Sequence, residues 1–308
     1  MTAECLAKSA KNLIPWKLRY RIKLTEARHP GFIPDILKQK SEPVYYNDVF
    51  YQALETMGIE SLEEKVICEM GPGQFLSHAF LAYQLGAAGS YLLEIGDFAG
   101  QDRYVKMNQP LLLKEENRRI RSLPKLGKAV TWNEYLKLLN AQYYTDGIDG
   151  YRRVPDLAAD YVFSFSVMEH IRKNVFRETM REMYRMMKYG GLSYHTVDLK
   201  DHFGGGKNHL RFSETDWEDS SHYSMDNYTN RISCSKLVSI WKETGFSVVS
   251  LKRERMDKRK LLRRSQLHPV FSDMSDKDLM TGSFTVVLKK EKMEKPEASQ
   301  TRQWTSQR

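Results

Sequence analysis

The chain has 308 residues, a formal net charge of +9 and only three cysteines. Hydrophobic residues make up 41% of it and charged residues 28%, which is typical of a globular domain with insertions. No apolar run is long enough for a transmembrane helix, and the first residues lack the pattern of a secretory signal. The cysteines are odd in number and far apart, which fits a reducing compartment better than a disulfide framework, and none has the spacing of a zinc site. We therefore expect a soluble, cytoplasmic protein.

The excess basic charge is spread over three segments of the chain. The densest of them, Lys252–Arg264, contains eight Lys and Arg residues. Such charge can meet nucleic acid, anionic lipid or an acidic substrate, or it can form only a solvated helix face. Near the start, Trp16–Leu24 alternates apolar and basic residues, which predicts a half-buried strand. The charge alone does not identify a partner, and peripheral contact with an anionic membrane remains one possible role.

Short apolar runs alternate with helical spacings from residue 65 onward. A first strand, Lys65–Met70, is broken by a glycine turn and followed by an apolar helix over Phe75–Leu85. An amphipathic helix is predicted over 173–188, and another over 233–244, with Ser233 as its N-cap and Gly245 after its end. The other predicted strands are Ser90–Ile95, Gln142–Tyr144, Asp160–Phe165, Leu192–Val197, Phe246–Leu251 and Ser283–Leu288.

This alternation predicts an α/β fold with a mostly parallel, Rossmann-like sheet and helices on both faces. We expect the domain to span residues 46–290, with an insertion at 203–231 after the fifth strand. Residues 1–45 are predicted to be a basic N-terminal extension, and residues 291–308 a disordered polar tail. Ligands of such folds bind at the carboxyl ends of the strands, so residues that follow strands are the site candidates.

A glycine turn follows the first strand and precedes a helix, in the order Glu69, Gly71, Gly73. Glycines at such a turn let the backbone bend sharply and approach a ligand closely. A dinucleotide-binding turn would carry a third glycine or alanine where this chain has Leu76, and the Glu69 carboxylate would repel a pyrophosphate. The turn favours a ligand with positive charge and hydroxyl groups, such as S-adenosylmethionine.

An acidic residue, Glu94, ends the second predicted strand about 20 residues after the turn. An acid in this place accepts hydrogen bonds from ribose hydroxyls in nucleotide-binding folds. Asp97 lies close by and is the alternative for the same role. Glu94 and the glycine turn together predict a nucleoside-containing ligand.

Five segments in this order resemble class I S-adenosylmethionine-dependent methyltransferases, in particular bacterial enzymes that act on sugars and other small molecules. The similar segments cover about 180 residues and read CEMGPG, LGA…LLEIGDFA, DYVFSFSVMEHI, MYRMMKYGGLSYHTVDLKDHF and YTNRISCSKLVSIWKETGF. Phe75 departs from the family pattern, which often has a further glycine there.

The resemblance implies a seven-stranded sheet whose last strand is antiparallel. It implies that Glu69, Gly71 and Gly73 hold the methionine part of the cofactor, that Glu94 holds the ribose, and that residues at the end of the fourth strand lie beside the transferable methyl group. Those residues are Ser164, Phe165 and Ser166. It also places Glu169 and His170 at the acid–histidine pair of these enzymes.

A second polar group leaves the fifth predicted strand and contains His195, Asp198, Asp201 and His202. A metal site of all four is not expected, because His195 and Asp198 point to opposite faces of a strand. We expect no metal and predict that His202 is the general base, with Asp198 orienting it. His170 is the alternative base, and backbone-bonded loop histidines are the structural alternative.

The insertion at 203–231 is rich in glycine and aromatic residues, which suits a mobile lid over a substrate. Asn230 and Arg231 close it, and Arg231 could clamp a carboxylate or phosphate or simply pair with an acid. We predict substrate contacts from His195, Asn230 and Arg231.

These patterns predict an O-methyltransferase that acts on a sugar or another small hydroxylated metabolite. A DNA amine methyltransferase would carry Asp/Asn-Pro-Pro-aromatic after the fourth strand, where this chain has Ser164–Val167, so a nucleic-acid partner is not expected. The alternatives are a lipid-linked or quinone-like acceptor at a membrane surface, a non-catalytic cofactor-binding partner subunit, and a nicotinamide-dependent enzyme.

Overall fold

A computed structural model describes residues 43–73, 76–99, 131–202, 205–218 and 228–291. The predicted basic extension up to residue 42, the strand predicted at Trp16–Leu24 and the polar tail from residue 292 lie outside these residues. In the described ranges, no helix combines the length and apolar character that a membrane crossing requires.

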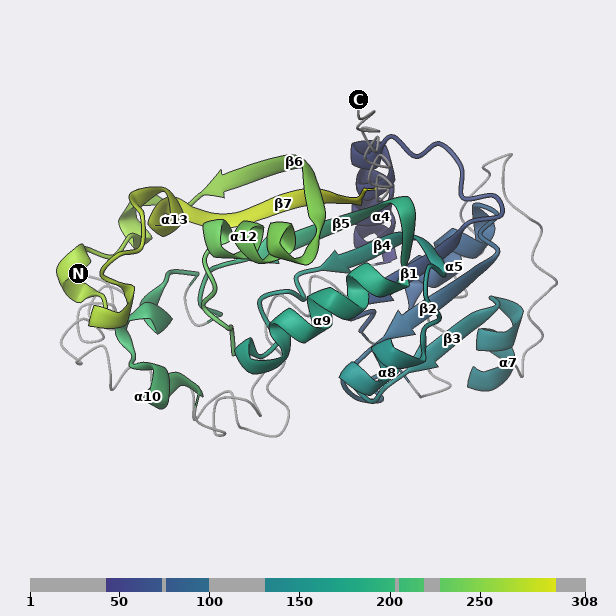
Figure 1. Ribbon diagram of the computed structural model, residues 1–308, viewed down its shortest axis with the longest axis horizontal. Helices are drawn as coiled ribbons and strands as arrows, with labels where there is room; N and C mark the ends of the chain where they lie inside the picture. Colours follow the sequence, from purple (N-terminus) through teal and green to yellow (C-terminus); the bar gives the residue numbers. More distant parts are fainter. Residues whose placement is uncertain (1–42, 74–75, 100–130, 203–204, 219–227, 292–308) are drawn as a thin grey trace, which may run out of the picture.

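One seven-stranded sheet forms the centre of the molecule, in the order β3-β2-β1-β4-β5-β7-β6 (Figure 1). The first five strands pair in parallel, whereas β7 is antiparallel to both of its neighbours. The predicted fold class is confirmed, including the antiparallel last strand. The strands are β1 (Val66–Met70), β2 (Gly89–Leu93), β3 (Ala141–Tyr144), β4 (Ala159–Phe165), β5 (Met187–Asp198), β6 (Phe246–Arg255) and β7 (Thr281–Lys290).

The strand order reverses between β1 and β4, since β2 and β3 lie on one side of β1 and the later strands on the other. In open α/β sheets the crevice at such a reversal is the usual ligand site. The register pairs Met70 at the end of β1 with Leu93 on β2 and Ser164 on β4. The loops that follow these three strands therefore meet at one edge of the sheet.

Helices cover both faces of the sheet (Figure 1). On one face, Met180 and Met183 of α9 (Lys173–Met186) and Trp241 of α12 (Cys234–Thr244) share a buried core with the strands. On the other face, α4 (Pro43–Met57) and α5 (Ser77–Gln84) pack against buried aromatic residues of β4 and β5. The remaining helices are α7 (Trp132–Leu138), α8 (Ile148–Arg153), η1 (Asn208–Arg211), α10 (Glu214–Glu218), η2 (Lys258–Lys260), η3 (Arg264–Gln266), η4 (Pro269–Phe271) and α13 (Asp276–Met280).

The ends of α12 are those that the sequence predicts. The Ser233 side chain accepts a hydrogen bond from the Lys236 backbone at 3.3 Å, and Gly245 follows in a left-handed conformation with φ 113°. Both groups satisfy backbone atoms that a helix end leaves without partners.

Two predicted boundaries are wrong. The helix expected over 173–188 ends at Met186, and β5 begins at once at Met187. A bulge near Ala159 lets Met187 pair with β4, so β5 is longer than its apolar run. The segment Lys252–Arg264, for which a solvated helix face was one interpretation, begins with the end of β6, an edge strand that pairs with β7 as far as Arg255, and continues through η2 to the start of η3. Charged side chains are common on such edges because they oppose further strand pairing.

Candidate functional site

The glycine turn after β1 has two different steric requirements. Gly71 and Gly73 both have φ of +68°, in the left-handed region that favours glycine. A Cβ at Gly71 would lie 2.5 Å from Val167 Cγ2, in the loop after β4. A Cβ at Gly73 would have no atom of the described chain within 4 Å. Gly71 therefore permits packing of two loops, while Gly73 borders open space that a ligand can enter.

Glu94 joins the ends of β1 and β2. Its Oε2 accepts a hydrogen bond from the Gly73 backbone at 3.2 Å, and its Oε1 accepts one from Ile95 at 2.9 Å. Burial raises the pKa of Glu94, and these two hydrogen bonds act in the opposite direction. The two motifs that the sequence singles out are thus in direct contact through Glu94, while the side chain of the alternative, Asp97, is exposed.

Glu69 is buried beneath the same turn. Its Oε1 lies 2.6 Å from Nδ1 of His78 on α5, and the His78 ring lies against Phe50 and Phe165. Its Oε2 is buried and has no hydrogen-bond partner within the described ranges. A buried carboxylate oxygen without a partner is costly, so this atom suits a cationic or hydrogen-donating group of a ligand.

Two apolar residues near Glu94 were not predicted as site residues. Ile95 is 79% exposed and Phe98 is 47% exposed, although both lie at the ligand edge of the sheet. Exposed apolar side chains beside a polar site provide a surface for an aromatic ring. The signal in the sequence was an apolar residue directly after the acid that ends a strand.

The three residues predicted to contact the cofactor at the end of β4 differ in how far they are buried. Ser164 is fully buried, whereas Phe165 and Ser166 are partly exposed. Ser166 has φ of +55°, and its backbone N–H donates to the carbonyl and the Oγ1 of Thr196. Left-handed backbone in a residue other than glycine is uncommon and often marks functional loops.

Ser164 and His195 form a buried pair between β4 and β5. Ser164 Oγ lies 2.7 Å from Nδ1 of His195, and the His195 ring stacks on Trp241 of α12. Burial lowers the pKa of His195 to about 3. Strand alternation directs both side chains into the helix-covered core, so neither has surface for the ligand contacts that the sequence predicts.

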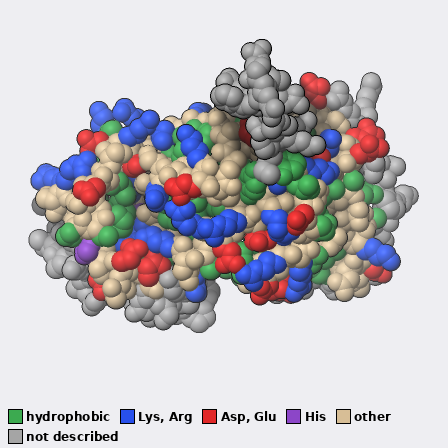
Figure 2. All heavy atoms as spheres, in the orientation of Figure 1, with side chains coloured by type: hydrophobic (Ala, Val, Ile, Leu, Met, Phe, Trp, Pro, Cys, Tyr) green, Lys and Arg blue, Asp and Glu red, His purple; other side chains and the backbone are tan. Residues whose placement is uncertain are grey.

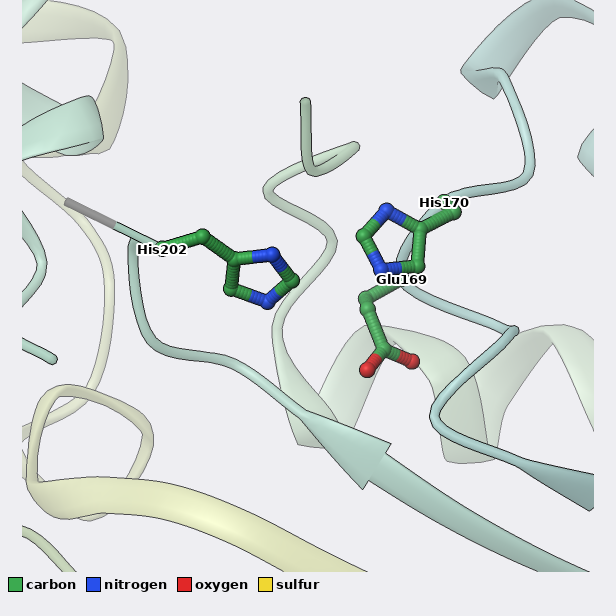
Figure 3. A group of neighbouring side chains, drawn as sticks. All are labelled: Glu169, His170 and His202. Atoms are coloured by element: carbon green, nitrogen blue, oxygen red, sulfur yellow. The ribbon is translucent and has the colours of Figure 1, made fainter. Parts of the chain in front are cut away.

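Glu169, His170 and His202 come together beyond the carboxyl ends of β4 and β5 (Figure 3). One nitrogen of each histidine and a carboxylate oxygen of Glu169 lie within 4.8 Å of one another. The two imidazole rings meet edge to face, 5.0 Å apart between centroids. The two histidines that the sequence offers as rival bases are therefore neighbours in one cluster.

Asp198 supports this cluster through its backbone. Its N–H donates to Glu169 Oε1 at 3.0 Å, while its carboxylate Oδ1 accepts from the backbone N–H and the Nζ of Lys200, each at 2.9 Å. These contacts tie Asp198 to Glu169 and Lys200. Its predicted role as the orienter of His202 stays a prediction.

Asn230 holds the loop that carries Glu169 and His170. Its side-chain amide donates to the carbonyls of Met168 and Ile171, each at 2.8 Å, and its backbone N–H donates to the Glu169 carbonyl at 2.7 Å. Asn230 is 1% exposed. It positions the loop because its amide is committed to the protein backbone, and the predicted substrate contact stays a prediction.

Arg231 is a structural residue of the insertion. Its guanidinium donates to the carbonyls of His209 and Phe212 and to the Glu214 carboxylate, and it lies over the rings of Trp217 and Phe271. Its side chain has no exposed surface. Arg231 forms the ion pair with Glu214 that was the alternative interpretation, and the predicted clamp on a substrate anion stays a prediction.

The described part of the insertion, residues 205–218 and 228–231, packs into a small core. Trp217 is 1% exposed and donates from Nε1 to the Thr229 carbonyl at 2.7 Å. The His209 ring lies 5.7 Å from that of Trp217, Lys207 is buried as well, and burial lowers the pKa of Lys207 to about 8. Opening of the insertion as a lid stays a prediction.

Comparison with known proteins gives structural likenesses only, since no family model and no curated protein matches the chain. A putative S-adenosylmethionine-dependent methyltransferase from Listeria monocytogenes is 13% identical over 79% of this chain and 96% of its own, with a TM-score of 0.44. A putative sarcosine dimethylglycine methyltransferase from Galdieria sulphuraria is 14% identical over 80% of this chain and 86% of its own, with a TM-score of 0.47. An S-adenosylmethionine-dependent methyltransferase from Archaeoglobus fulgidus is 13% identical over 79% of this chain and 94% of its own, with a TM-score of 0.44. At such identities and TM-scores, these likenesses establish neither the family nor the activity of this chain.

Proposed function

We propose that this protein is an S-adenosylmethionine-dependent methyltransferase that methylates a hydroxyl of a sugar or another small metabolite. The observation that carries the proposal is the contact between Gly73 and Glu94 at the strand-order reversal of the sheet. It brings a glycine turn and a half-buried acid together at the edge where such folds bind nucleoside ligands.

The residues at this edge suit the parts of that cofactor. Glu69 Oε2 is a buried acceptor without a partner in the described chain and suits the ammonium group. Glu94 accepts two backbone hydrogen bonds, and carboxylate oxygens have further lone pairs for ribose hydroxyls. The exposed side chains of Ile95 and Phe98 suit an adenine ring.

When bound, the cofactor supplies an electrophilic methyl group on a sulfonium. The protein contributes position, since holding two reactants in line accounts for much of the acceleration of such transfers. The cluster of Glu169, His170 and His202 lies at the adjacent carboxyl ends of β4 and β5, where it can hold an acceptor hydroxyl. Removal of the hydroxyl proton there would add roughly 10²–10⁴-fold to the rate.

Calorimetry with S-adenosylhomocysteine tests the cofactor site directly. We expect micromolar binding, and a ligand concentration of 100 times Kd should stabilise the fold by about 2.7 kcal/mol. Glu94→Ala should weaken binding at least tenfold, while Glu60→Ala, which changes an exposed glutamate away from the turn, should not. Absence of heat and of a thermal shift at millimolar concentration, or stabilisation by NAD alone, would refute the proposal.

A lipid-linked or quinone-like acceptor is the second candidate, because basic side chains gather on β6 and the segment after it. A partner subunit that binds the cofactor but does not catalyse methyl transfer is the third candidate. Transfer of the methyl group from the cofactor to any soluble sugar acceptor would exclude the third candidate and favour the first.

A further inference from the structure

We infer that Glu169, His170 and His202 form a binding site for one divalent transition-metal ion. Three potential ligand atoms, two imidazole nitrogens and one carboxylate oxygen, lie within 4.8 Å of one another. Figure 3 shows the side chains converging on one space from two loops, one after β4 and one after β5. His202 is 32 positions after His170 in the chain, so the fold itself brings the two loops together.

Hydrogen bonding already prepares His170 as a ligand. Its Nδ1 lies 2.7 Å from the carbonyl oxygen of Tyr228. Because a carbonyl can only accept, Nδ1 carries the hydrogen and Nε2 keeps its lone pair. Metal-binding histidines almost always donate their second ring nitrogen to a carbonyl or carboxylate in this way.

Glu169 is likewise held in place. It is 1% exposed, its Oε1 accepts from the Asp198 backbone, and its own carbonyl accepts from the Asn230 backbone. A buried carboxylate is retained more easily when it is paired with a cation or coordinates a metal. The backbone bond to Oε1 also fixes the direction of the carboxylate group.

The donor set selects the kind of ion. Two imidazoles with one carboxylate suit zinc, manganese, iron(II) or cobalt, whereas magnesium and calcium prefer oxygen ligands alone. Metal–ligand bonds of about 2.0–2.2 Å place ligand atoms roughly 3–3.5 Å apart, so the ion would draw the three side chains together by about 1 Å. Three protein ligands leave coordination positions open for a substrate, as in catalytic zinc sites.

An ion at this site would bind the acceptor hydroxyl and lower its pKa, so that the proton is released to water before the methyl group is transferred. This role rests on the proposed methyl transfer, but the binding of the ion does not. The two histidines would then serve as ligands in place of a general base. An acceptor with two adjacent oxygens, such as a vicinal diol, would fill two open positions.

Metal binding is measured on the full chain, freed of metal by dialysis against a chelator, by calorimetry with Zn²⁺ and by visible absorption with Co²⁺. We expect one ion per chain, with affinity at least 100-fold weaker in His170→Ala and in His202→Ala. His268→Ala, in which a histidine outside the cluster is lost, is the matched control and should bind as the wild type does.

Equal affinity in all four proteins, or no binding of either ion at millimolar concentration, would overturn the metal site. Circular dichroism identifies any variant that fails to fold, and His202→Ala remains informative because His202 is partly exposed on a loop. S-adenosylhomocysteine binding is measured in the same variants. Its retention without metal binding would overturn this site alone, whereas its absence with metal binding intact would overturn the proposed cofactor instead.

Discussion

Two glycines two residues apart differ in what their missing side chains allow. Gly71 lets the turn after β1 contact Val167 in the loop after β4, whereas Gly73 borders space with no atom of the described chain. The sequence predicts both as cofactor-loop residues from one motif. The two glycines differ only through the packing of a second loop, which contacts Gly71 and leaves Gly73 beside open space.

Alanine at each glycine should separate these roles. Both substitutions place a side chain at positive φ, which costs about 1 kcal/mol, but Gly71→Ala adds a 2.5 Å contact with Val167 Cγ2. We expect Gly71→Ala to lower the free energy of unfolding by about 2–4 kcal/mol, since overpacking adds about 1–3 kcal/mol. Gly73→Ala should cost about 1 kcal/mol and weaken cofactor binding instead.

Urea denaturation measures both effects, and Val167→Ala provides the control. Combined with Gly71→Ala, it should recover part of the lost stability, because it removes the two nearest carbon atoms. Equal losses at the two glycines, with no recovery in the double variant, would contradict this reading of the turn.

His195 should make the stability of the fold depend on pH. Burial lowers its pKa to about 3, below its usual value of 6.5, so the unfolded chain binds a proton between these values and the folded chain does not. The free energy of unfolding should therefore fall as pH drops below about 6.5, by up to about 1.4 kcal/mol per pH unit. Denaturation at pH 7.5 and pH 5.5 should show a smaller fall in His195→Gln than in the wild type. An equal fall in both would show that His195 becomes protonated inside the fold.

At the scale of elements, residues 228–231 join the loop after β4 to the insertion. Tyr228 and Asn230 bond the loop that carries Glu169 and His170, and Arg231 bonds the backbone at residues 209–213. The sequence predicts Asn230 and Arg231 as important from their place at the end of the insertion. It does not predict their contacts with the backbone, because polar residues near a site can bond either the ligand or the backbone. Which one they serve depends on the path of the insertion, which no local pattern specifies.

Asn230→Asp tests this connection. The substitution replaces the amide donor by a carboxylate oxygen, which would face the carbonyls of Met168 and Ile171. An unsatisfied buried charge of this kind costs about 3 kcal/mol or more, so we expect lower stability and faster amide hydrogen exchange in residues 166–172. Asn133→Asp, on an exposed face of α7, is the control and should change neither. Unchanged hydrogen exchange in Asn230→Asp would show that the loop keeps its conformation without the hydrogen bonds from the Asn230 amide.

For the whole molecule, apolar periodicity predicted the seven strands and their order in the chain, because a buried strand must be apolar whatever its neighbours are. It also predicted that Glu69, Gly73 and Glu94 lie at one edge of the sheet, since Glu69 is near the end of β1, while Gly73 and Glu94 follow β1 and β2. The meeting of His170 and His202 was not predicted. They belong to different loops, and their distance depends on how β4 and β5 pair and on the 228–231 segment. For Lys252–Arg264 the sequence left a solvated helix face and contact with an anionic partner both open, because charge patterns do not show that the first four of these residues belong to β6.

The charges around Lys252–Arg264 bear on whether the acceptor is soluble or bound to a membrane. Figure 2 shows Lys and Arg side chains with Asp and Glu among them on the visible face. Within and around Lys252–Arg264, Arg259 lies 2.6 Å from Asp257 and Arg264 lies 2.6 Å from Asp276. These acids reduce the local positive field, and at an ionic strength of about 0.15 M exposed charges act over only about 8 Å.

We therefore expect little co-flotation with phosphatidylserine vesicles at about 0.15 M salt, and increasing flotation as salt is lowered. Each exposed basic residue contributes about 1 kcal/mol near an anionic surface, so Lys258→Glu should weaken the low-salt binding. Lys137→Glu, a charge reversal on the exposed part of α7, should weaken it less. Strong flotation at physiological ionic strength that Lys258→Glu abolishes and Lys137→Glu does not would contradict a freely soluble acceptor. It would favour the lipid-linked one, because an enzyme that meets its acceptor at a membrane must remain there at the ionic strength of the cell.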